Sequence, residues 1–419
     1  MLLEDPANPG GRQLVASRAG IRRFWPEGTG PDGTDAGDFL QDWRGRLQAR
    51  RDPSAAPACI IYAAYEAGGM FERLPAPATP VPAAILWMLY PEWSLCFEGD
   101  AVHLAAGSES MLDELERMLA HAAANPAPEG DASVAGDARG DAWDGAWEVT
   151  PGEDYMDAVR RVKAYVAAGD VFQANIARFW RMPFAAEALP ALHARLRRVN
   201  PAPFSGWLRV ETDETTMHVL SASPERLFRL MPDGMVETRP IAGTRRRGQA
   251  DDEAMRRELL LSEKERAEHI MLVDLERNDL GRVCRPGTVE VNERMVVERY
   301  ATVQHIVSNV RGRLRPECDV VDVFRAMFPG GTITGCPKVR CMEIIHELER
   351  RARGPYTGAM GYVAWDGSAD MNILIRSFWH VDGALHWAAG AGIVADSDPS
   401  RELAETEHKA AGLLRALTP

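Results

Sequence analysis

From Thr150 onward, two kinds of hydrophobic periodicity occupy separate stretches of the chain. Segments such as GWLRVE, TMHVLSAS and RLFRLM alternate apolar and polar residues in the manner of half-buried strands. The segments SEKERAEHIMLVDLERNDLGR and DPSRELAETEHKAAGLLRAL have helical spacing instead. Because strands and helices are segregated rather than strictly alternating, the pattern favours an α+β fold with mostly antiparallel sheets.

The 419-residue chain divides into three expected parts. Residues 1–121 hold the buried-strand candidates ACIIYAAY and AAILWMLY and an amphipathic helix, so this region should contribute to the sheet core. Residues 122–149 are rich in Ala, Gly, Asp and Pro, which predicts a linker or surface loop. Residues 150–419 have the clearest pattern and should carry the functional site.

Composition excludes several classes of protein. The net charge is −13 and the only dense basic run is Arg245–Arg247, so we expect no nucleic-acid partner. The six cysteines form no CxxC pair and no zinc spacing. The start, MLLEDPANPG, lacks an apolar signal region, and no apolar stretch is long enough for a bilayer span. These features predict a reduced, soluble, cytoplasmic protein with no membrane partner.

The glycine-rich segment FPGGTITGCPKVR resembles a phosphate loop at first sight. Its lysine, Lys338, comes one place too late, because Cys336 and Pro337 separate it from Gly335. Pro337 suits the first position of a helix, where free backbone amides favour an anion such as a carboxylate or a phosphate. An ordinary glycine-rich helix entry has the same spacing. The later turn GAGIV also lacks the spacing of a dinucleotide motif.

Two acidic residues raise the possibility of a metal site. Glu268 lies on a helix whose positions three, four and seven residues on are apolar, and Glu405 shares a helix face with Lys409. Two carboxylates can hold a hard divalent cation, and the lack of a His or Cys cluster favours magnesium over zinc. The alternative for Glu268 is a position at the edge of the apolar stripe with its carboxylate in water. The alternative for Glu405 and Lys409 is a surface ion pair. The segment MNILIRSFWHVDG reads as one strand, and Arg376, at the end of MNILIR, can grip a carboxylate or be a surface cation.

Several segments, in order, resemble the chorismate-utilising enzymes: anthranilate synthase component I, aminodeoxychorismate synthase component I, and the isochorismate and salicylate synthases. They are GDVFQANIARFW, SASPERLFRL, TRPIAGTRRRG, AEHIMLVDLERNDLGRV, VQHIVSNVRG, FPGGTITGCPKVRCMEIIHELE, YTGAMGY, ILIRS, AGAGIVADSDP and ELAETEHKA. The resemblance is dense over residues 150–419 and loose before them. It implies two large, mostly antiparallel sheets packed face to face with helices outside.

The resemblance also implies how chorismate would bind. Glu268 and Glu405 would bind Mg²⁺, which anchors the ring carboxylate, and Lys409 would lie one helical turn on, beside the metal. The enolpyruvyl carboxylate would be held by Tyr356 and Arg376, with backbone amides near Gly335 and Gly392.

Catalytic roles follow in the same way. Glu225 matches the general acid that protonates the departing C4 hydroxyl, which requires a raised pKa. Its alternative role is a glutamate in a β-turn. His305 and Thr244 match positions near the ring. Gln173 stands where water-using members have a lysine base, and Ala242 stands where many aminodeoxychorismate synthases have a lysine nucleophile.

These differences favour one branch of the family. Glutamine cannot deprotonate water, so ammonia is the expected nucleophile and isochorismate or salicylate synthesis is disfavoured. Ala242 is typical of anthranilate synthases, whereas FQAN, FPGGTITG and YAAYEAGGMFERLP resemble aminodeoxychorismate synthases. We expect chorismate to be aminated to 4-amino-4-deoxychorismate for p-aminobenzoate and folate synthesis; the alternative is anthranilate synthase component I, which forms anthranilate and pyruvate. No cysteine lies in a Gly-x-Cys-x-Gly context, so a separate glutamine amidotransferase subunit should supply ammonia.

Overall fold

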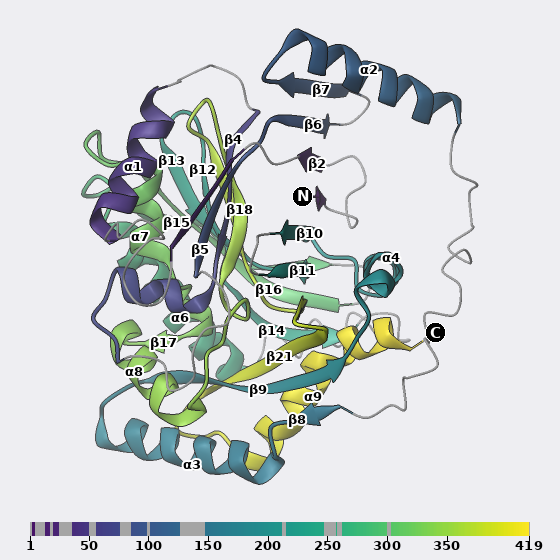
Figure 1. Ribbon diagram of the computed structural model, residues 1–419. Coiled ribbons are helices and arrows are strands. Elements are labelled where there is room, and N and C mark those ends of the chain that lie inside the picture. Colours follow the sequence, from purple (N-terminus) through teal and green to yellow (C-terminus); the bar gives the residue numbers. More distant parts are fainter. Residues whose placement is uncertain are drawn as a thin grey trace.

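Two large sheets form the framework of the protein (Figure 1). The computed structural model describes residues 2–4, 13–16, 20–24, 36–49, 56–75, 85–98, 101–125, 147–211, 215–246, 257, 262–299 and 303–418. Between neighbouring named strands in this part of the chain, the pairing is antiparallel throughout.

The first sheet has eleven strands, among them the first (β1) and the last (β21) named strand along the chain. In spatial order its strands are β17 (Gly335–Cys336), β9 (Gln173–Pro183), β21 (Ala384–Ile393), β20 (Ser377–Val381), β11 (Thr216–Ser223), β10 (Phe204–Glu211), β1 (Leu2–Glu4), β2 (Gln13–Ala16), β6 (Trp93–Glu98) and β7 (Ala101–Ala106), with β8 (Glu148–Val149) beside β9.

The second sheet has ten strands and packs against the first. Its order is β14 (Ile241–Arg246), β16 (Val303–Arg313), β13 (Met235–Thr238), β12 (Arg226–Leu230), β19 (Ala369–Ile373), β18 (Ala359–Ala364), β4 (Pro57–Ala63), β5 (Leu86–Tyr90) and β3 (Gly20–Phe24), with β15 (Glu290–Arg299) beside β16. One continuous core joins Phe179 and Val219 of the first sheet to Ile60 and Phe228 of the second. The expected α+β fold with two facing sheets is therefore confirmed.

Helices cover the outer faces and edges of both sheets (Figure 1). Those that contact the first sheet are α2 (Glu109–Ala124), α3 (Gly152–Ala168), α4 (Leu189–Val199), α8 (Lys338–Glu349) and α9 (Pro399–Leu417). Those at the second sheet are α6 (Glu263–Gly281) and α7 (Val320–Met327), with α1 (Ala36–Ala49) packed on α7. The short 3₁₀ helices are η1 (Tyr65–Met70), η3 (Ala186–Ala188) and η4 (Gly331–Ile333). Of the helices that the structure describes, none combines the length and the apolar character that crossing a membrane requires.

Local sequence signals set several helix ends as expected. Ser262 accepts a hydrogen bond from the backbone N–H of Glu265 at the start of α6. Asp398 caps α9 in the same way, with Pro399 as the first helical residue. Gly169 ends α3 in a left-handed conformation with φ of 82°, which glycine adopts without steric cost. These ends depend on short-range chemistry, which explains why the sequence predicts them.

The N-terminal region contributes strands to both sheets. β1, β2, β6 and β7 join the first sheet, and β3, β4 and β5 join the second. Helix α2 continues to Ala124, three residues past the expected boundary at 121. At the other end of the expected linker, β8 pairs with β9. Residues 126–146 of that linker lie outside the described residues.

One predicted strand is wrong. The segment MNILIRSFWHVDG reads as a single strand, yet it forms β19 in the second sheet and β20 in the first. Arg376 lies between them with a left-handed backbone, φ of 52°, which interrupts the extended run. The apolar pattern cannot reveal this break, because both halves are buried. Arg376 therefore sits where the chain passes from one sheet to the other.

Candidate active site

Lys338, which follows the glycine-rich turn, is a structural residue in this fold. Its Nζ donates to Asp279 Oδ2 at 2.6 Å and to the carbonyls of Met327 at 3.2 Å and Ala326 at 3.4 Å. The side chains of the Lys338–Asp279 pair are only 10% and 8% exposed. All three ammonium protons therefore have acceptors, and the lysine ties the start of α8 to α6 and to the end of α7. The phosphate-loop interpretation does not apply to it.

Two of the predicted glycines make room for Gln173. Gly335 has φ of 127°, and a Cβ there would lie 2.1 Å from the carbonyl oxygen of Gln173. A Cβ on Gly392 would lie 2.5 Å from Gln173 Nε2. Gln173 is 1% exposed, and its Oε1 has no hydrogen-bond partner among the described residues. The side-chain amide thus lies against Gly392 of β21, and Gly335 of β17 packs on the main-chain carbonyl of the same residue.

Helix α9 meets strand β21 beside this glutamine. Lys409 Nζ contacts Glu405 Oε1 at 2.8 Å and donates to the carbonyl of Gly390 at 2.9 Å. The side chains of Lys409 and Glu405 are 34% and 49% exposed. A Cβ on Gly390 would lie 2.8 Å from the hydroxyl of Tyr356, so this tyrosine reaches the same strand. Burial raises the pKa of Tyr356, which keeps its hydroxyl protonated as a hydrogen-bond donor.

Arg376 and His305 extend the candidate site from Tyr356 and Glu405 toward the second sheet. Burial lowers the pKa of Arg376, while the nearby Tyr356 and Glu405 favour its charged form. His305 Nδ1 lies 3.2 Å from the carbonyl of Gly243, next to Ala242 on β14. The pKa of His305 is lowered to about 4, mainly by burial and also by the charge of Arg376, while the hydrogen bond with Gly243 opposes this effect. The imidazole is therefore neutral at pH 7.

Thr244 of β14 is the backbone pairing partner of His305 on β16. The side chain of Thr244 lies outside the described residues, so its predicted place near the ring stays a prediction. Ala242 is 5% exposed and pairs with Ile306.

Glu225 lies in the turn between β11 and β12 and is 6% exposed. Its backbone is fixed because its N–H donates to Ser223 Oγ at 3.2 Å and its carbonyl accepts from the N–H of Ile373 at 3.1 Å. Burial raises the pKa of Glu225 to about 7, against opposing effects of the Thr332 hydroxyl and the Lys409 charge. A carboxyl that is substantially protonated near neutral pH can act as a general acid.

The predicted metal ligands lie on two helices that line this region. α6 carries the half-buried Glu268 and packs on β14 and β16, the strands of Ala242 and His305. α9 carries Glu405 and, one turn earlier, the buried Glu402. Carboxylate oxygens are the donors that Mg²⁺ prefers, so the residue types fit this ion. Among the residues that the structure describes, no three His, Cys, Asp or Glu side chains form a metal cluster. Joint binding of one ion by Glu268 and Glu405 stays a prediction.

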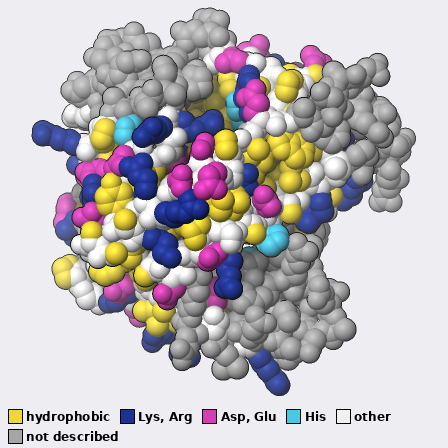
Figure 2. Space-filling model, turned by 90° about the horizontal axis from the view of Figure 1, so that it is seen from below, with side chains coloured by type: hydrophobic (Ala, Val, Ile, Leu, Met, Phe, Trp, Pro, Cys, Tyr) yellow, Lys and Arg dark blue, Asp and Glu magenta, His cyan; other side chains and the backbone are white. Residues whose placement is uncertain are grey.

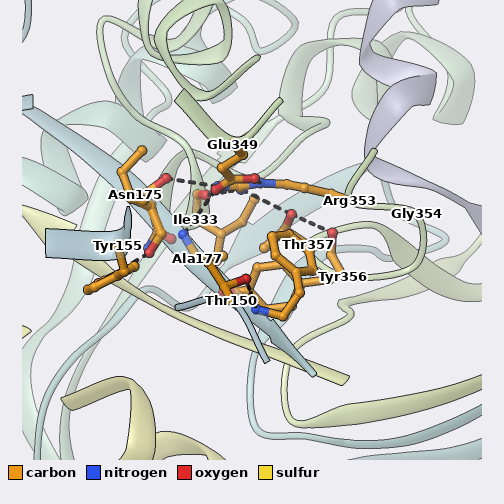
Figure 3. Close-up of polar contacts among 12 residues, drawn as sticks. Thr150, Tyr155, Asn175, Ala177, Ile333, Glu349, Arg353, Gly354, Tyr356 and Thr357 are labelled. Atoms are coloured by element: carbon orange, nitrogen blue, oxygen red, sulfur yellow. Dashed lines mark hydrogen bonds and ion pairs between the residues drawn. The ribbon is translucent and has the colours of Figure 1, made fainter. Parts of the chain in front are cut away.

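Sequence analysis missed a buried charge network beneath Tyr356 (Figure 3). Arg353 is 1% exposed and pairs with Glu349 at 2.6 and 2.9 Å. Its guanidinium also donates to the carbonyls of Asn175 at 2.8 Å and Ile333 at 3.2 Å, and it lies over the Tyr356 ring at 5.6 Å. Glu349 in turn accepts from a backbone N–H of β9 at 2.9 Å. The network therefore joins α8, β9, η4 and the Tyr356 loop, and its only sequence signal is an i, i+4 charge pair.

Two buried acids on α6 were also missed. Glu276 is 3% exposed and Asp279 is 6% exposed. Glu276 follows Glu268 by eight residues and so lies on the same side of the helix, which is the signal that could have found it.

Comparisons with known proteins found related sequences and a related structure. A model of the chorismate binding enzyme family matches residues 22–415. The chain is 50% identical over 277 residues to the anthranilate synthase component I-like protein of Synechocystis, covering 64% of this chain and 55% of that protein. It is 48% identical over 268 residues to aminodeoxychorismate synthase component 1 of Bacillus subtilis, covering 63% and 56%. The chain thus spans little more than half the length of these two relatives.

A solved structure is similar over nearly the whole chain. Anthranilate synthase component I from Streptococcus pneumoniae superposes with a TM-score of 0.78 at 27% sequence identity. The match covers 97% of this chain and 92% of that one.

Proposed function

The chain belongs to the family of chorismate-binding enzymes, and on this premise we propose that it aminates chorismate with ammonia to give 4-amino-4-deoxychorismate. The observation that carries the choice of nucleophile is Gln173. It is buried among glycine backbone and has an amide where a water-activating enzyme of this family would have a lysine. An amide cannot remove a proton from water, whereas ammonia carries its own lone pair and needs no such base when it arrives neutral.

The surrounding residues would bind and orient chorismate. Tyr356 and Arg376 would hold the enolpyruvyl carboxylate through a protonated hydroxyl and a guanidinium, both of which donate to carboxylate oxygens. Glu225 would protonate the C4 oxygen as its bond to the ring breaks. Because burial raises the pKa of Glu225 to about 7, the required proton is present at neutral pH. The neutral His305 would orient the ring without adding a charge.

Magnesium is part of this proposal. Glu268 and Glu405 would hold it, and a bound Mg²⁺ would supply positive charge to seat the ring carboxylate. Lys409, which contacts Glu405 at 2.8 Å, adds a second positive charge on the same side.

The alternative product is anthranilate, and Ala242 favours it. This alanine is buried opposite Ile306, so no amine is available there to attack the ring. The segments FQAN and FPGGTITG favour the aminodeoxychorismate product instead, and the two relatives above bear both names. We place aminodeoxychorismate first because these segments lie beside Gln173 and β17.

A glutamine amidotransferase subunit is the proposed source of ammonia. In the view of Figure 2, basic and acidic side chains are intermingled with hydrophobic ones. The described residues on this face therefore form no continuous basic surface of the kind that binds nucleic acid. A mixed surface is compatible with a protein partner.

The decisive experiment is incubation with chorismate, Mg²⁺ and ammonium, with products separated by chromatography. We expect an aminated chorismate that yields p-aminobenzoate only after a lyase is added. Anthranilate with pyruvate would overturn the choice of product, and unchanged chorismate would overturn the proposed function. Glu225→Gln should lower turnover by about 10²–10⁴-fold, the usual contribution of a general acid.

A further inference from the structure

Glu276 is a buried carboxyl that the chemistry above does not use. It is 3% exposed, and its Oε2 has no hydrogen-bond partner among the described residues. Burial raises the pKa of Glu276 well above its usual range and the charges of Asp279 and Glu225 contribute to this, while the charge of Lys338 and a hydrogen bond with Thr238 oppose it. An acidic side chain left buried with an unbonded oxygen is costly for the fold. This cost suggests that Glu276 has a partner that arrives from outside the chain.

The glycine-rich turn places Glu276 next to the general acid. A Cβ on Gly331 would lie 3.4 Å from Glu276 Oε1, so the carboxyl packs on the turn itself. The following residue, Thr332, faces Glu225, whose pKa its hydroxyl lowers. Glu225 Oε1 and Thr332 Oγ1 also lack well-aligned hydrogen-bond partners within the described part of the chain. Two buried carboxyls and a hydroxyl therefore lie at one turn, and each has an oxygen that can still form a hydrogen bond.

The unused atoms share one chemical property. Glu225 Oε1 and Glu276 Oε2 are carboxyl oxygens that can accept hydrogen bonds. A ligand that satisfies such a set must be rich in donors. Ammonium has four N–H donors and no acceptor, and its charge favours an ionised carboxylate beside it. A carboxylate substrate would add acceptors where acceptors are already in excess.

We propose that Glu276, with Glu225 and Thr332, binds the nitrogen nucleophile as ammonium and that the Glu276 carboxylate takes one of its protons. This inference rests on the proposed amination. NH₄⁺ gives a proton to Glu276, and the freed lone pair forms the C–N bond to the ring. The C–O bond breaks with its electron pair on oxygen, and Glu225 protonates that oxygen to release water. The proton on Glu276 then returns to Glu225, so NH₄⁺ and the alcohol have become water and a protonated amine.

The charges around the pair are compatible with this exchange. Asp279 on α6 faces Glu276, but Lys338 from α8 neutralises it at 2.6 Å. Lys409 from α9 faces Glu225. The two carboxyls repel each other, so a single proton is shared more easily than two charges are held. Lys338 lowers the pKa of Glu276, and a bound cation beside this carboxyl would add to that effect and favour its charged form.

The test compares Glu276→Gln with the unaltered enzyme at several pH values, with ammonium chloride as nitrogen source. The glutamine variant keeps the shape of the side chain but has no base, so it must use free NH₃. While the pH is below the pKa of ammonium, the fraction present as NH₃ rises about tenfold with each unit of increasing pH. The ratio of the variant's kcat/KM for ammonium to that of the unaltered enzyme should be about 0.01 at pH 7 and rise toward 1 near pH 9. Glu276→Gln also removes a charge that acts on Glu225, so the pKa of Glu225 is read from the alkaline limb of kcat in each enzyme and the ratio is corrected for the difference.

Asp274→Asn is the matched control, because Asp274 is an exposed acid on the same helix. Its ratio should stay near 1 at every pH. A ratio for Glu276→Gln that is constant with pH, while the unaltered enzyme still aminates chorismate, overturns this inference alone. If the unaltered enzyme forms no aminated product at any pH, the proposed function fails as well.

Discussion

Two ion pairs with the same i, i+4 spacing have different surroundings in this protein. Glu349 and Arg353 are 2.6 Å apart, and their side chains are 2% and 1% exposed. Glu405 and Lys409 are 2.8 Å apart, and their side chains are 49% and 34% exposed. The first pair is surrounded by backbone carbonyls and the rings of Tyr65 and Tyr356. The second opens to solvent beside Gly390.

The difference shows how burial assigns a role to a pair of charges. A sealed pair is already satisfied and costs several kcal/mol to break, so it serves as a fixed support. An exposed pair is worth about 0–1 kcal/mol, so its members exchange partners at little cost to stability. Arg353 therefore positions Tyr356 and β9, while Glu405 and Lys409 belong to the proposed metal and substrate site.

Breaking the sealed pair should have the largest effect. Arg353→Met leaves Glu349 buried without its cation and should lower the free energy of unfolding by about 3–5 kcal/mol. Urea denaturation measures this loss. The double variant Arg353→Met/Glu349→Met removes both charges and should regain much of the stability. Equal stability of the single and double variants would show that the buried charge is not the cause.

Breaking the open pair should affect activity more than stability. Glu405→Gln should change the free energy of unfolding by less than about 1 kcal/mol. It should lower turnover of chorismate by about 100-fold at limiting Mg²⁺, with partial recovery at high Mg²⁺, because the ion loses one carboxylate. Initial rates over a magnesium titration measure the effect. Asp42→Asn disrupts an i, i+4 pair on α1, also 2.8 Å long, and should leave turnover unchanged. Similar rates for the two variants would contradict a role for Glu405.

The smallest effect concerns the pH dependence of turnover. Glu225 must be protonated to act, so turnover should fall as pH rises through its pKa of about 7. The positive charge of Lys409 opposes the increase in that pKa. Lys409→Met should therefore raise the pKa of Glu225 and move the alkaline limb of the kcat profile upward by about half a pH unit. Lys409→Arg keeps the charge and should leave the limb in place. A downward shift in Lys409→Met would refute the interaction.

The residues proposed for the site stand in recognisable sequence segments, whereas the residues that support them do not. Gln173, Tyr356 and Arg376 stand in segments with strong family resemblance, and the structure places them around β9 and β21. Arg353 and Glu276 carry no comparable signal. Their importance comes from burial, and burial depends on residues far away along the chain that pack against them.

What the sequence determines by itself is local. Separate strand and helix periodicities predict the α+β class, and Ser262, Asp398 and Gly169 set helix ends through contacts a few residues away. Only the tertiary structure decides that MNILIRSFWHVDG is divided between two sheets and that Lys338 is buried against Asp279. The physical reason is range: capping and periodicity act within a helical turn, whereas strand partners and desolvation are set by the whole packed chain.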